Sequence, residues 1–202
     1  MKLIIMTKPT FFVEEDKILT SLFEEGMESL HLYKPCAAPM YSERLLTLLS
    51  DEYAGKITVH EHFYLKEEYK LRGIHIDDPF TTVPDGFKGR ISRTCQAIAD
   101  LSVAKKDSDY ILLKYVFDSL SDNSNKSTLS MDQLKEASSR GLINRRVYAM
   151  GGMSLDNIRM AKDLGFGGVV ICGDLWNRFD IHQQLDYKEL ISHFEKLRKA
   201  IG

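Results

Sequence analysis

The amino-acid sequence predicts an α/β fold, and within that class a single-domain (β/α)8 TIM barrel whose eight parallel strands form a closed sheet. Short apolar runs alternate with amphipathic helical patterns eight times, as expected for parallel strands joined by crossover helices. A length of 202 residues suits one domain rather than two. We therefore expect a single domain over residues 1–202, with an open doubly wound sheet as the alternative.

The individual elements follow from changes in apolar spacing and from turn residues. The expected strands are Lys2–Met6, Ser29–Tyr33, Lys56–His60, Gly73–Ile76, Arg90–Ser92, Tyr110–Leu113 and the apolar runs that precede Gly151 and Gly173. The expected helices are Glu14–Gly26, Met40–Asp51, Phe63–Leu71, Cys95–Lys105, Met131–Ser139, Leu155–Leu164 and a closing helix, Tyr187–Ala200. Residues 77–87 are rich in Asp and Pro, so the helix after the fourth strand is expected to be reduced.

Composition excludes several classes of function. The formal net charge is −2, so there is no basic field to attract nucleic acid or an anionic membrane. No apolar run approaches the ~20 residues needed to cross a bilayer. The cysteines Cys36, Cys95 and Cys172 are odd in number and widely separated, which argues against both a disulfide framework and a zinc site. We expect a cytoplasmic protein with neither nucleic acid nor membrane as a partner.

Polar residues and glycines follow the predicted strands, and in a TIM barrel the carboxyl ends of the strands form the active-site rim. In strand order these residues are Lys34; His60, Glu61 and His62; His75, Asp77 and Asp78; Ser92; Lys114 with Ser119 and Ser121; Gly151 and Gly152; and Cys172 and Gly173. We expect these groups to converge at one end of the barrel.

The glycines after the last two strands predict a phosphorylated ligand. A residue without a Cβ atom lets backbone N–H groups come close to an anion. The loops after strands 7 and 8 are the usual phosphate site of a TIM barrel. Gly151-Gly152 and Cys172-Gly173 stand at these two loops. A tight turn without a ligand remains the alternative for Gly151-Gly152.

Three further groups of rim residues allow two interpretations. His60 and His62 share one face of an extended chain and could bind a metal with Asp77 or Asp78, or they could simply end a polar strand. The two aspartates precede Pro79 and could be turn formers. Lys34 could bind an anion or be a solvated lysine, and Cys172 is expected to be a packed side chain rather than a nucleophile.

The order of several segments carries a resemblance over nearly the whole chain. These segments are Leu30–Lys34, His60-Glu61, Gly73–Asp78, Asp109–Ile111, Ser119 with Ser121, and Ala149–Met153 followed by Asn157. They resemble, in that order, the Gln-Φ-Arg-Glu-Lys, Asn-Asp, Gly-Val-His-Leu-Gly-Gln, Asp-Tyr-Φ, paired-threonine and Ala-Φ-Gly-Gly-Φ motifs of the thiamine phosphate synthase and thiazole tautomerase superfamily.

The resemblance implies an enzyme of thiamine biosynthesis, a transferase. A synthase of this kind couples a pyrimidine diphosphate to a thiazole phosphate and releases pyrophosphate. It implies a pyrophosphate contact for Lys34 and a place for Ser92 in the substrate site. The thiazole phosphate would lie at Gly151, Gly152, Cys172 and Gly173, and Ser119 and Ser121 would take the roles of the threonines. It further implies Mg²⁺, for which Asp77, Asp78 and Glu61 are the candidate ligands, and a homodimer.

The chain departs from the synthase pattern around the expected pyrophosphate site. Leu30, Leu32 and Phe80 stand where the motifs have Gln, Arg and a metal-binding Asp. These changes leave open a thiazole phosphate tautomerase, whose acid–base histidine matches Thr94, so that His60, His62 or His75 would transfer the proton. A catalytically impaired phosphate-binding barrel and a metal-dependent epimerase also remain open. A thiamine phosphate synthase-family enzyme is the leading expectation.

Overall fold

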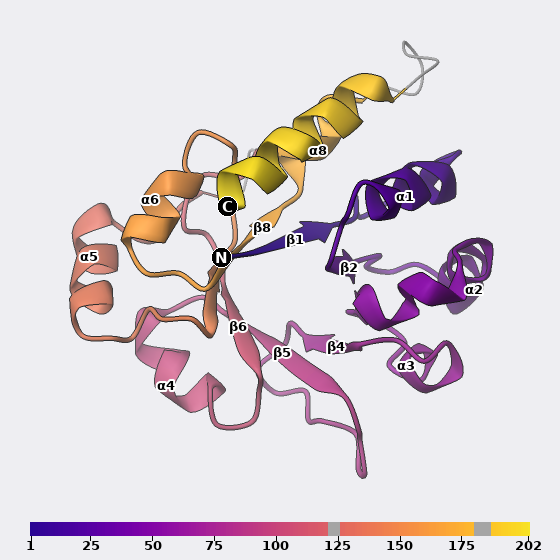
Figure 1. Cartoon of the computed structure of the whole chain (residues 1–202). Coiled ribbons are helices and arrows are strands. Elements are labelled where there is room, and N and C mark those ends of the chain that lie inside the picture. Colours follow the sequence, from indigo (N-terminus) through magenta and orange to yellow (C-terminus); the bar gives the residue numbers. More distant parts are fainter. Residues whose placement is uncertain (121–125, 180–186) are drawn as a thin grey trace.

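The computed structural model describes residues 1–120, 126–179 and 187–202, and within them eight strands close into a parallel barrel. The strands are β1 (Lys2–Met6), β2 (Leu30–Leu32), β3 (Ile57–Val59), β4 (Gly73–Ile76), β5 (Arg90–Cys95), β6 (Tyr110–Leu113), β7 (Val147–Ala149) and β8 (Gly168–Ile171). Each strand pairs with the next along the chain, and β1 pairs with β8 from Lys2↔Gly168 to Ile5↔Ile171, which closes the sheet (Figure 1). This confirms the predicted TIM barrel over the open sheet.

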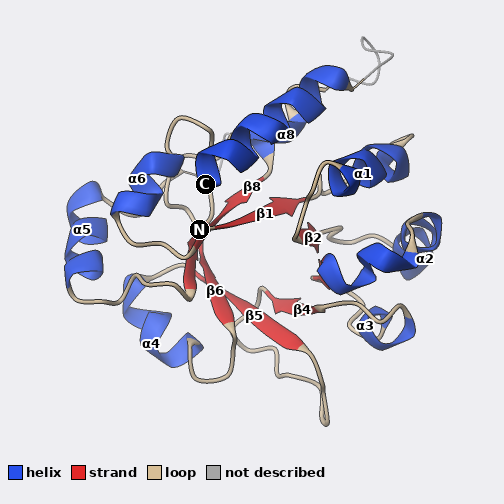
Figure 2. Ribbon diagram, in the orientation of Figure 1, coloured by secondary structure: helices blue, strands red, loops and turns tan. Residues whose placement is uncertain are grey.

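Helices surround the barrel (Figure 2). They are α1 (Glu15–Glu24), α2 (Pro39–Leu48), α3 (Leu65–Glu68), α4 (Leu101–Ala104), α5 (Met131–Ser139), α6 (Ile158–Asp163), α7 (Gly173–Trp176) and α8 (Lys188–Ile201), with 3-10 turns at Asp51–Lys56 and Ile98–Asp100. Residues 77–89, between β4 and β5, contain no helix. The helix after the fourth strand, which was expected to be reduced, is therefore absent from this segment.

Two expected helices are much shorter in the structure, and one short helix was not expected. The helix expected from Cys95 begins later, because β5 stays paired with β6 as far as Cys95↔Leu113. The helix expected over 63–71 shrinks to α3, with His62 before it and Lys70 after it in the left-handed region at φ 54°. The short helix α7, directly after Cys172 at the end of β8, was not predicted.

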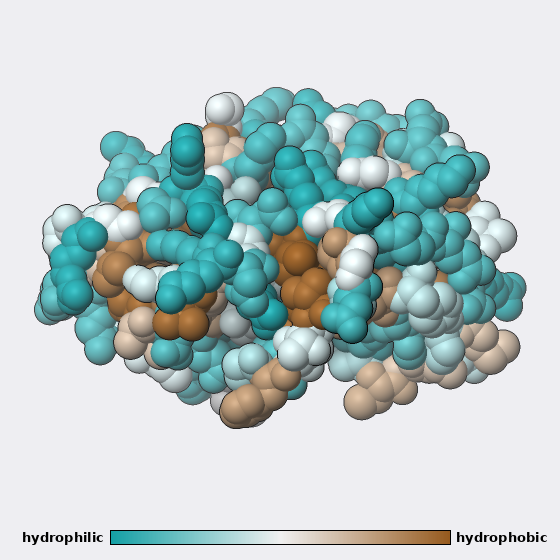
Figure 3. Space-filling view, turned by 90° about the horizontal axis from the view of Figure 1, so that it is seen from below, coloured by the Kyte–Doolittle hydropathy of each residue, from teal (hydrophilic) through white to brown (hydrophobic). Residues whose placement is uncertain are grey.

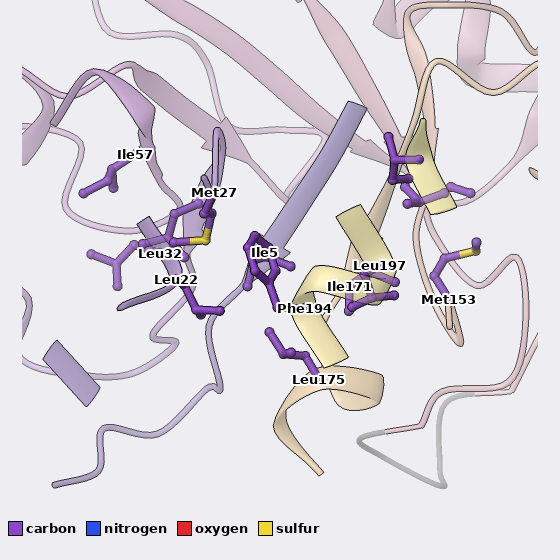
Figure 4. Packing of buried hydrophobic residues seen from close by; sticks show 14 of the residues in the cluster. Ile5, Leu22, Met27, Leu32, Ile57, Met153, Ile171, Leu175, Phe194 and Leu197 are labelled. Atoms are coloured by element: carbon purple, nitrogen blue, oxygen red, sulfur yellow. The ribbon is translucent and has the colours of Figure 1, made fainter. Parts of the chain in front are cut away.

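The outer faces of the strands and the inner faces of the helices share one large apolar core. Ile5 and Ile171 project outward from β1 and β8, and Phe194 and Leu197 of α8 lie against them, as Figure 4 shows. Spacing of three and four residues puts Leu190, Phe194, Leu197 and Ile201 on the buried face of α8, the amphipathic pattern expected of a helix that covers a sheet.

The barrel interior has an apolar wall and a polar wall. Since side chains alternate along a strand, every second residue points into the barrel. On β1, β6 and β8 and at the end of β7 the inward residues include Ile4, Leu112, Val170 and Met150, which form a second apolar cluster with Met6 and Tyr110. On β2 to β5 the buried residues at the alternate positions are His31, Thr58, His75 and Ser92. This asymmetry places ionisable groups beneath one half of the rim.

The described helices include none long and apolar enough to cross a membrane. Hydrophilic residues cover most of the face seen in Figure 3, and hydrophobic residues gather near its centre and toward its left side.

Candidate active site

A cavity of about 350 Å³ opens at the carboxyl ends of the strands. The residues that line it are Met6, Pro9, Tyr33, His60, Asp77, Lys114, Tyr115, Ser119, Leu120, Met150, Gly151, Gly152, Met153, Val170, Cys172 and Gly173. The rim residues predicted after the third, fourth, sixth, seventh and eighth strands thus meet in one pocket. Ser121 lies outside the described residues.

The Gly151-Gly152 loop needs glycine at both positions for two reasons. Both residues have positive φ, 95° at Gly151 and 61° at Gly152, where L-residues are strained. A Cβ atom on Gly152 would also lie 2.2 Å from the carbonyl oxygen of Asp118. The side chain of Asn157 holds the loop, donating to Gly152 O at 2.9 Å and accepting from the N–H of Ser154 at 2.9 Å. The loop after β7 is therefore fixed against the loop after β6.

The second glycine loop runs from Cys172 into α7, and Asp174 connects it to its surroundings. The carboxylate of Asp174 accepts from the N–H of Leu155 at 3.1 Å and from Nε2 of His193 at 2.7 Å. The backbone N–H groups of Gly151, Gly152 and Gly173 donate to no other group among the described residues. These three glycines line the cavity, and their unused N–H groups are suited to an anion.

Asp77 joins the pocket to the polar wall of the barrel. Its Oδ2 accepts from Nδ1 of His60 at 2.7 Å, and its Oδ1 accepts from the hydroxyl of Thr94 at 2.7 Å. Burial by itself would raise the pKa of Asp77, but hydrogen bonds from His60 and His75 outweigh this effect and hold the pKa well below its usual value. Asp77 is therefore an anion at neutral pH.

A chain of hydrogen bonds continues from Asp77 into the interior. Nε2 of His60 lies 2.9 Å from Nδ1 of His31, and Nε2 of His31 lies 2.7 Å from the hydroxyl oxygen of Tyr110. Because each bond needs one donor, one arrangement that satisfies the whole chain has His60 donating to the ionised Asp77, His31 donating to His60, and Tyr110 donating to His31.

His75 forms a parallel branch next to this chain. Its Nδ1 lies 2.7 Å from Oγ of Ser92, and its Nε2 lies 2.9 Å from Oγ1 of Thr94. Burial, with the nearby His60 as the second cause, lowers the pKa of His75 to about 4. The same two causes lower the pKa of His31 well below its usual value. Both rings are therefore uncharged at neutral pH, each with one N–H.

Lys34 does not line the cavity. Its Nζ lies 2.6 Å from Oε1 of Glu15 and donates to Thr10 O at 3.1 Å, and the side chain is 1% exposed. Burial lowers the pKa of Lys34 and the Glu15 carboxylate opposes this effect. The lysine expected to contact pyrophosphate is instead half of a buried ion pair.

Three further predicted residues also lie away from the pocket. Glu61 accepts from the N–H of Lys34 at 3.0 Å, and the Nε2 of His62 lies 2.9 Å from Ala37 O. Asp78 caps an exposed turn, accepting from the N–H of Phe80 and the hydroxyl of Thr81. The grouping of His60, His62 and Asp77 or Asp78 around a metal is therefore wrong, because the side chains of His62 and Asp78 bond elsewhere and neither belongs to the metal-ligating group of the described residues.

The sequence-based interpretation missed the residues that project inward from β2. Leu30 and Leu32, which stand at the Gln and Arg positions of the motif, belong to the apolar core outside the barrel. His31 projects into the interior, and Tyr33 lines the cavity. Strict alternation of leucine with a polar residue in this strand was the signal that could have identified both residues. Ser92, which was predicted, is buried beneath His75 rather than exposed in the cavity.

Solved structures share the architecture of this chain over nearly its whole length, although no family model and no curated protein matches it. The crystal structure of a thiamine phosphate pyrophosphorylase from Bacteroides thetaiotaomicron is 45% identical, covers 99% of this chain and 97% of its own, and superposes with a TM-score of 0.90. A thiamine phosphate pyrophosphorylase from Pyrococcus furiosus is 19% identical, with 99% and 95% covered and a TM-score of 0.73. A 3-hexulose-6-phosphate synthase, 12% identical with a TM-score of 0.65 and all of both chains covered, shares the fold. The chain belongs to the thiamine phosphate pyrophosphorylase family.

Proposed function

We propose that this protein is a thiamine phosphate synthase, which couples a pyrimidine diphosphate to a thiazole phosphate and releases pyrophosphate. The observation that carries the proposal is the 45% identity, over nearly the whole chain, to a structure described as a thiamine phosphate pyrophosphorylase. The cavity supports it, since a single pocket at the usual active-site end of the barrel holds both glycine loops and ionisable groups.

The thiazole phosphate would bind at the two glycine loops. Gly151, Gly152 and Gly173 present backbone N–H groups that no other described residue uses. Fixed dipoles of this kind bind a phosphate without the cost of reorganising the loop. Cys172 would contribute packing beside them, and Ser119 a hydroxyl from the facing loop.

The diphosphate would lie on the opposite side, near Lys114, Tyr33, His60 and Asp77. Lys114 is the one lysine or arginine among the described residues that line the cavity. It would take the role that the resemblance gave to Lys34, whose ammonium group is already paired with Glu15. A positive charge beside a departing diphosphate stabilises the charge that develops on it.

Mg²⁺ fits this site through one carboxylate. Mg²⁺ is commonly held by one or two carboxylates together with substrate phosphate oxygens and water. Asp77 reaches the cavity and has further acceptor capacity beyond its bonds to His60 and Thr94, whereas Glu61 and Asp78 are held elsewhere. When bound, the ion would neutralise negative charge on the diphosphate. His60 would orient Asp77, and Tyr33 would cover the ring of the pyrimidine.

The test is a coupled assay with both substrates and Mg²⁺ that follows thiamine phosphate and pyrophosphate together. The proposal expects equal amounts of the two products. If the protein forms neither product but still shows a thermal shift with thiazole phosphate, the synthase proposal is refuted. The remaining hypothesis is then a phosphate-binding barrel without this activity.

A second candidate, tautomerisation of a thiazole phosphate, is favoured by the His60–Asp77 pair at the cavity wall. A carboxylate hydrogen-bonded to an imidazole is a common arrangement for proton transfer. Incubation of thiazole phosphate with the protein in D₂O distinguishes the two activities, because deuterium incorporation without the pyrimidine diphosphate is expected only of the tautomerase. The cytoplasmic location and the homodimer remain predictions.

A further inference from the structure

We propose that His31, His60 and His75 form a binding site for a divalent first-row transition metal such as Zn²⁺, in the barrel interior directly beneath the cavity. The three rings come from β2, the end of β3 and β4, and each offers a nitrogen within 4.8 Å of the others. Their ring centroids are 4.2 to 5.4 Å apart. This is the one such group of metal-ligating side chains in the part of the chain that the structure describes.

The surroundings of the rings match those of metal-bound histidines. A metal-ligating histidine usually donates its other N–H to an oxygen atom, which fixes the ring and its tautomer. Asp77 takes this part for Nδ1 of His60, and Tyr110 for Nε2 of His31, both at 2.7 Å. For His75, either the hydroxyl of Ser92 at Nδ1 or that of Thr94 at Nε2 would accept the N–H, and the other ring nitrogen would bind the ion.

The His31–His60 pair requires only a small change to accept an ion, whereas His75 has to release one of its two hydrogen bonds, to Ser92 or to Thr94, so that one ring nitrogen can turn to the ion. Nδ1 of His31 and Nε2 of His60 face each other at 2.9 Å. Two nitrogens on tetrahedral Zn²⁺ at 2.0–2.1 Å would be about 3.3 Å apart, so the rings need to separate by a few tenths of an ångström. His31 would change its tautomer from Nδ1–H to Nε2–H, and the Tyr110 hydroxyl would change from donor to acceptor. No proton needs to leave the cluster.

The donor set selects the kind of metal. Three imidazole nitrogens suit Zn²⁺, Co²⁺, Ni²⁺ or Fe²⁺, whereas Mg²⁺ prefers oxygen ligands. The nearby Asp77 anion offsets part of the ion's charge in this buried position. The site is therefore distinct in chemistry from a Mg²⁺ ion held by a diphosphate in the cavity above.

The experiment uses the untagged full chain after dialysis against a chelator. Titration with Co²⁺ is expected to give the visible absorption of a four-coordinate ion at one equivalent per chain. Zn²⁺ should abolish this absorption, and a large excess of Mg²⁺ should leave it unchanged. His31→Gln and His75→Gln are expected to lose the stoichiometric binding. His62→Gln is the matched control, since His62 lies outside the cluster and should bind as the unmodified protein does.

Asp77→Asn keeps all three ligands and tests the site without removing a buried ring. It is expected to weaken Co²⁺ affinity by about 10- to 100-fold. The proposal is overturned if the dialysed native chain gives no absorption with Co²⁺, or if His62→Gln reduces binding as much as His31→Gln does. If a glutamine variant fails to fold by circular dichroism, the native titration and Asp77→Asn decide the question. If the native chain gives no absorption with Co²⁺, the three rings form a hydrogen-bonded network only and not a metal site.

Discussion

Replacing Gly152 with alanine tests whether the loop after β7 is held by backbone geometry and by close packing together. Gly152 has φ 61°, and the left-handed conformation costs an alanine about 1–2 kcal/mol. The new methyl carbon would lie 2.2 Å from Asp118 O, about 1 Å inside the ~3.3 Å of a close C···O contact. It would also lie 2.7 Å from Cβ of Phe117, so the loop after β6 has to move.

The expected loss of stability is the sum of these two effects. Inserting a carbon into a packed site costs about 1–3 kcal/mol, so Gly152→Ala should lower the free energy of unfolding by about 2–5 kcal/mol. Two glycines provide matched controls. Gly165 has φ 82° and open space around its Cβ position, so its alanine variant should lose only the backbone contribution, about 1–2 kcal/mol. Gly55 has open space and no positive φ, so Gly55→Ala should change stability little.

Urea unfolding of the three variants, followed by circular dichroism, measures these differences. The expected order of stability is Gly55→Ala, then Gly165→Ala, then Gly152→Ala. Equal stability of Gly152→Ala and Gly165→Ala would refute the packing part of the reasoning. A thermal-shift titration with thiazole phosphate adds a separate readout, because Gly152→Ala should weaken binding whereas Gly165→Ala should not.

Two further predictions concern the lysines that follow β2 and β6. Lys34→Met leaves the Glu15 carboxylate buried without its partner and should lower the free energy of unfolding by about 3–5 kcal/mol. The double variant Lys34→Met with Glu15→Leu should lose much less stability than the two single variants added together. A double-mutant cycle measured by urea unfolding checks this expectation, and additive losses would contradict it. Lys114→Met should raise the KM for the diphosphate substrate by about 10- to 100-fold, which corresponds to the loss of a hydrogen bond between charged groups. The surface control Lys162→Met should leave this KM unchanged. Initial-rate kinetics measure both values, and equal KM values for the two variants would show that Lys114 does not belong to the site.

Local patterns in the sequence were enough to predict the barrel and part of the pocket. Strand and helix periodicities depend on neighbouring residues, so the eight alternations were visible without any long-range contact. The bounds of β1, β4, β6 and α5 agree with the prediction. Gly151-Gly152 and Cys172-Gly173 were located as a pair of loops because strands 7 and 8 end next to each other in any closed barrel.

Residues distant in sequence decided which polar groups belong to the site. Lys34 looked like a rim cation, but α1 brings Glu15 within 2.6 Å of it and removes its charge from the pocket. His62 looked like a partner of His60, yet its Nε2 lies 2.9 Å from Ala37 O, in the segment before α2. Neither outcome follows from residue type or spacing, because each depends on where another segment packs.

By itself, the sequence determined the fold class, the carboxyl-end rim and the two glycine loops, since each follows from a repeat or a turn of a few residues. Only the tertiary structure decided that His31, His60 and His75 meet, 29 and 15 residues apart along the chain. The register pairs His31 with Thr58 and, continued one residue past Val59↔Ile74, sets His60 beside His75, while the side chains of His31 and His60 reach each other at 2.9 Å. The physical reason is that strand alternation is local, while register and closure are properties of the whole barrel.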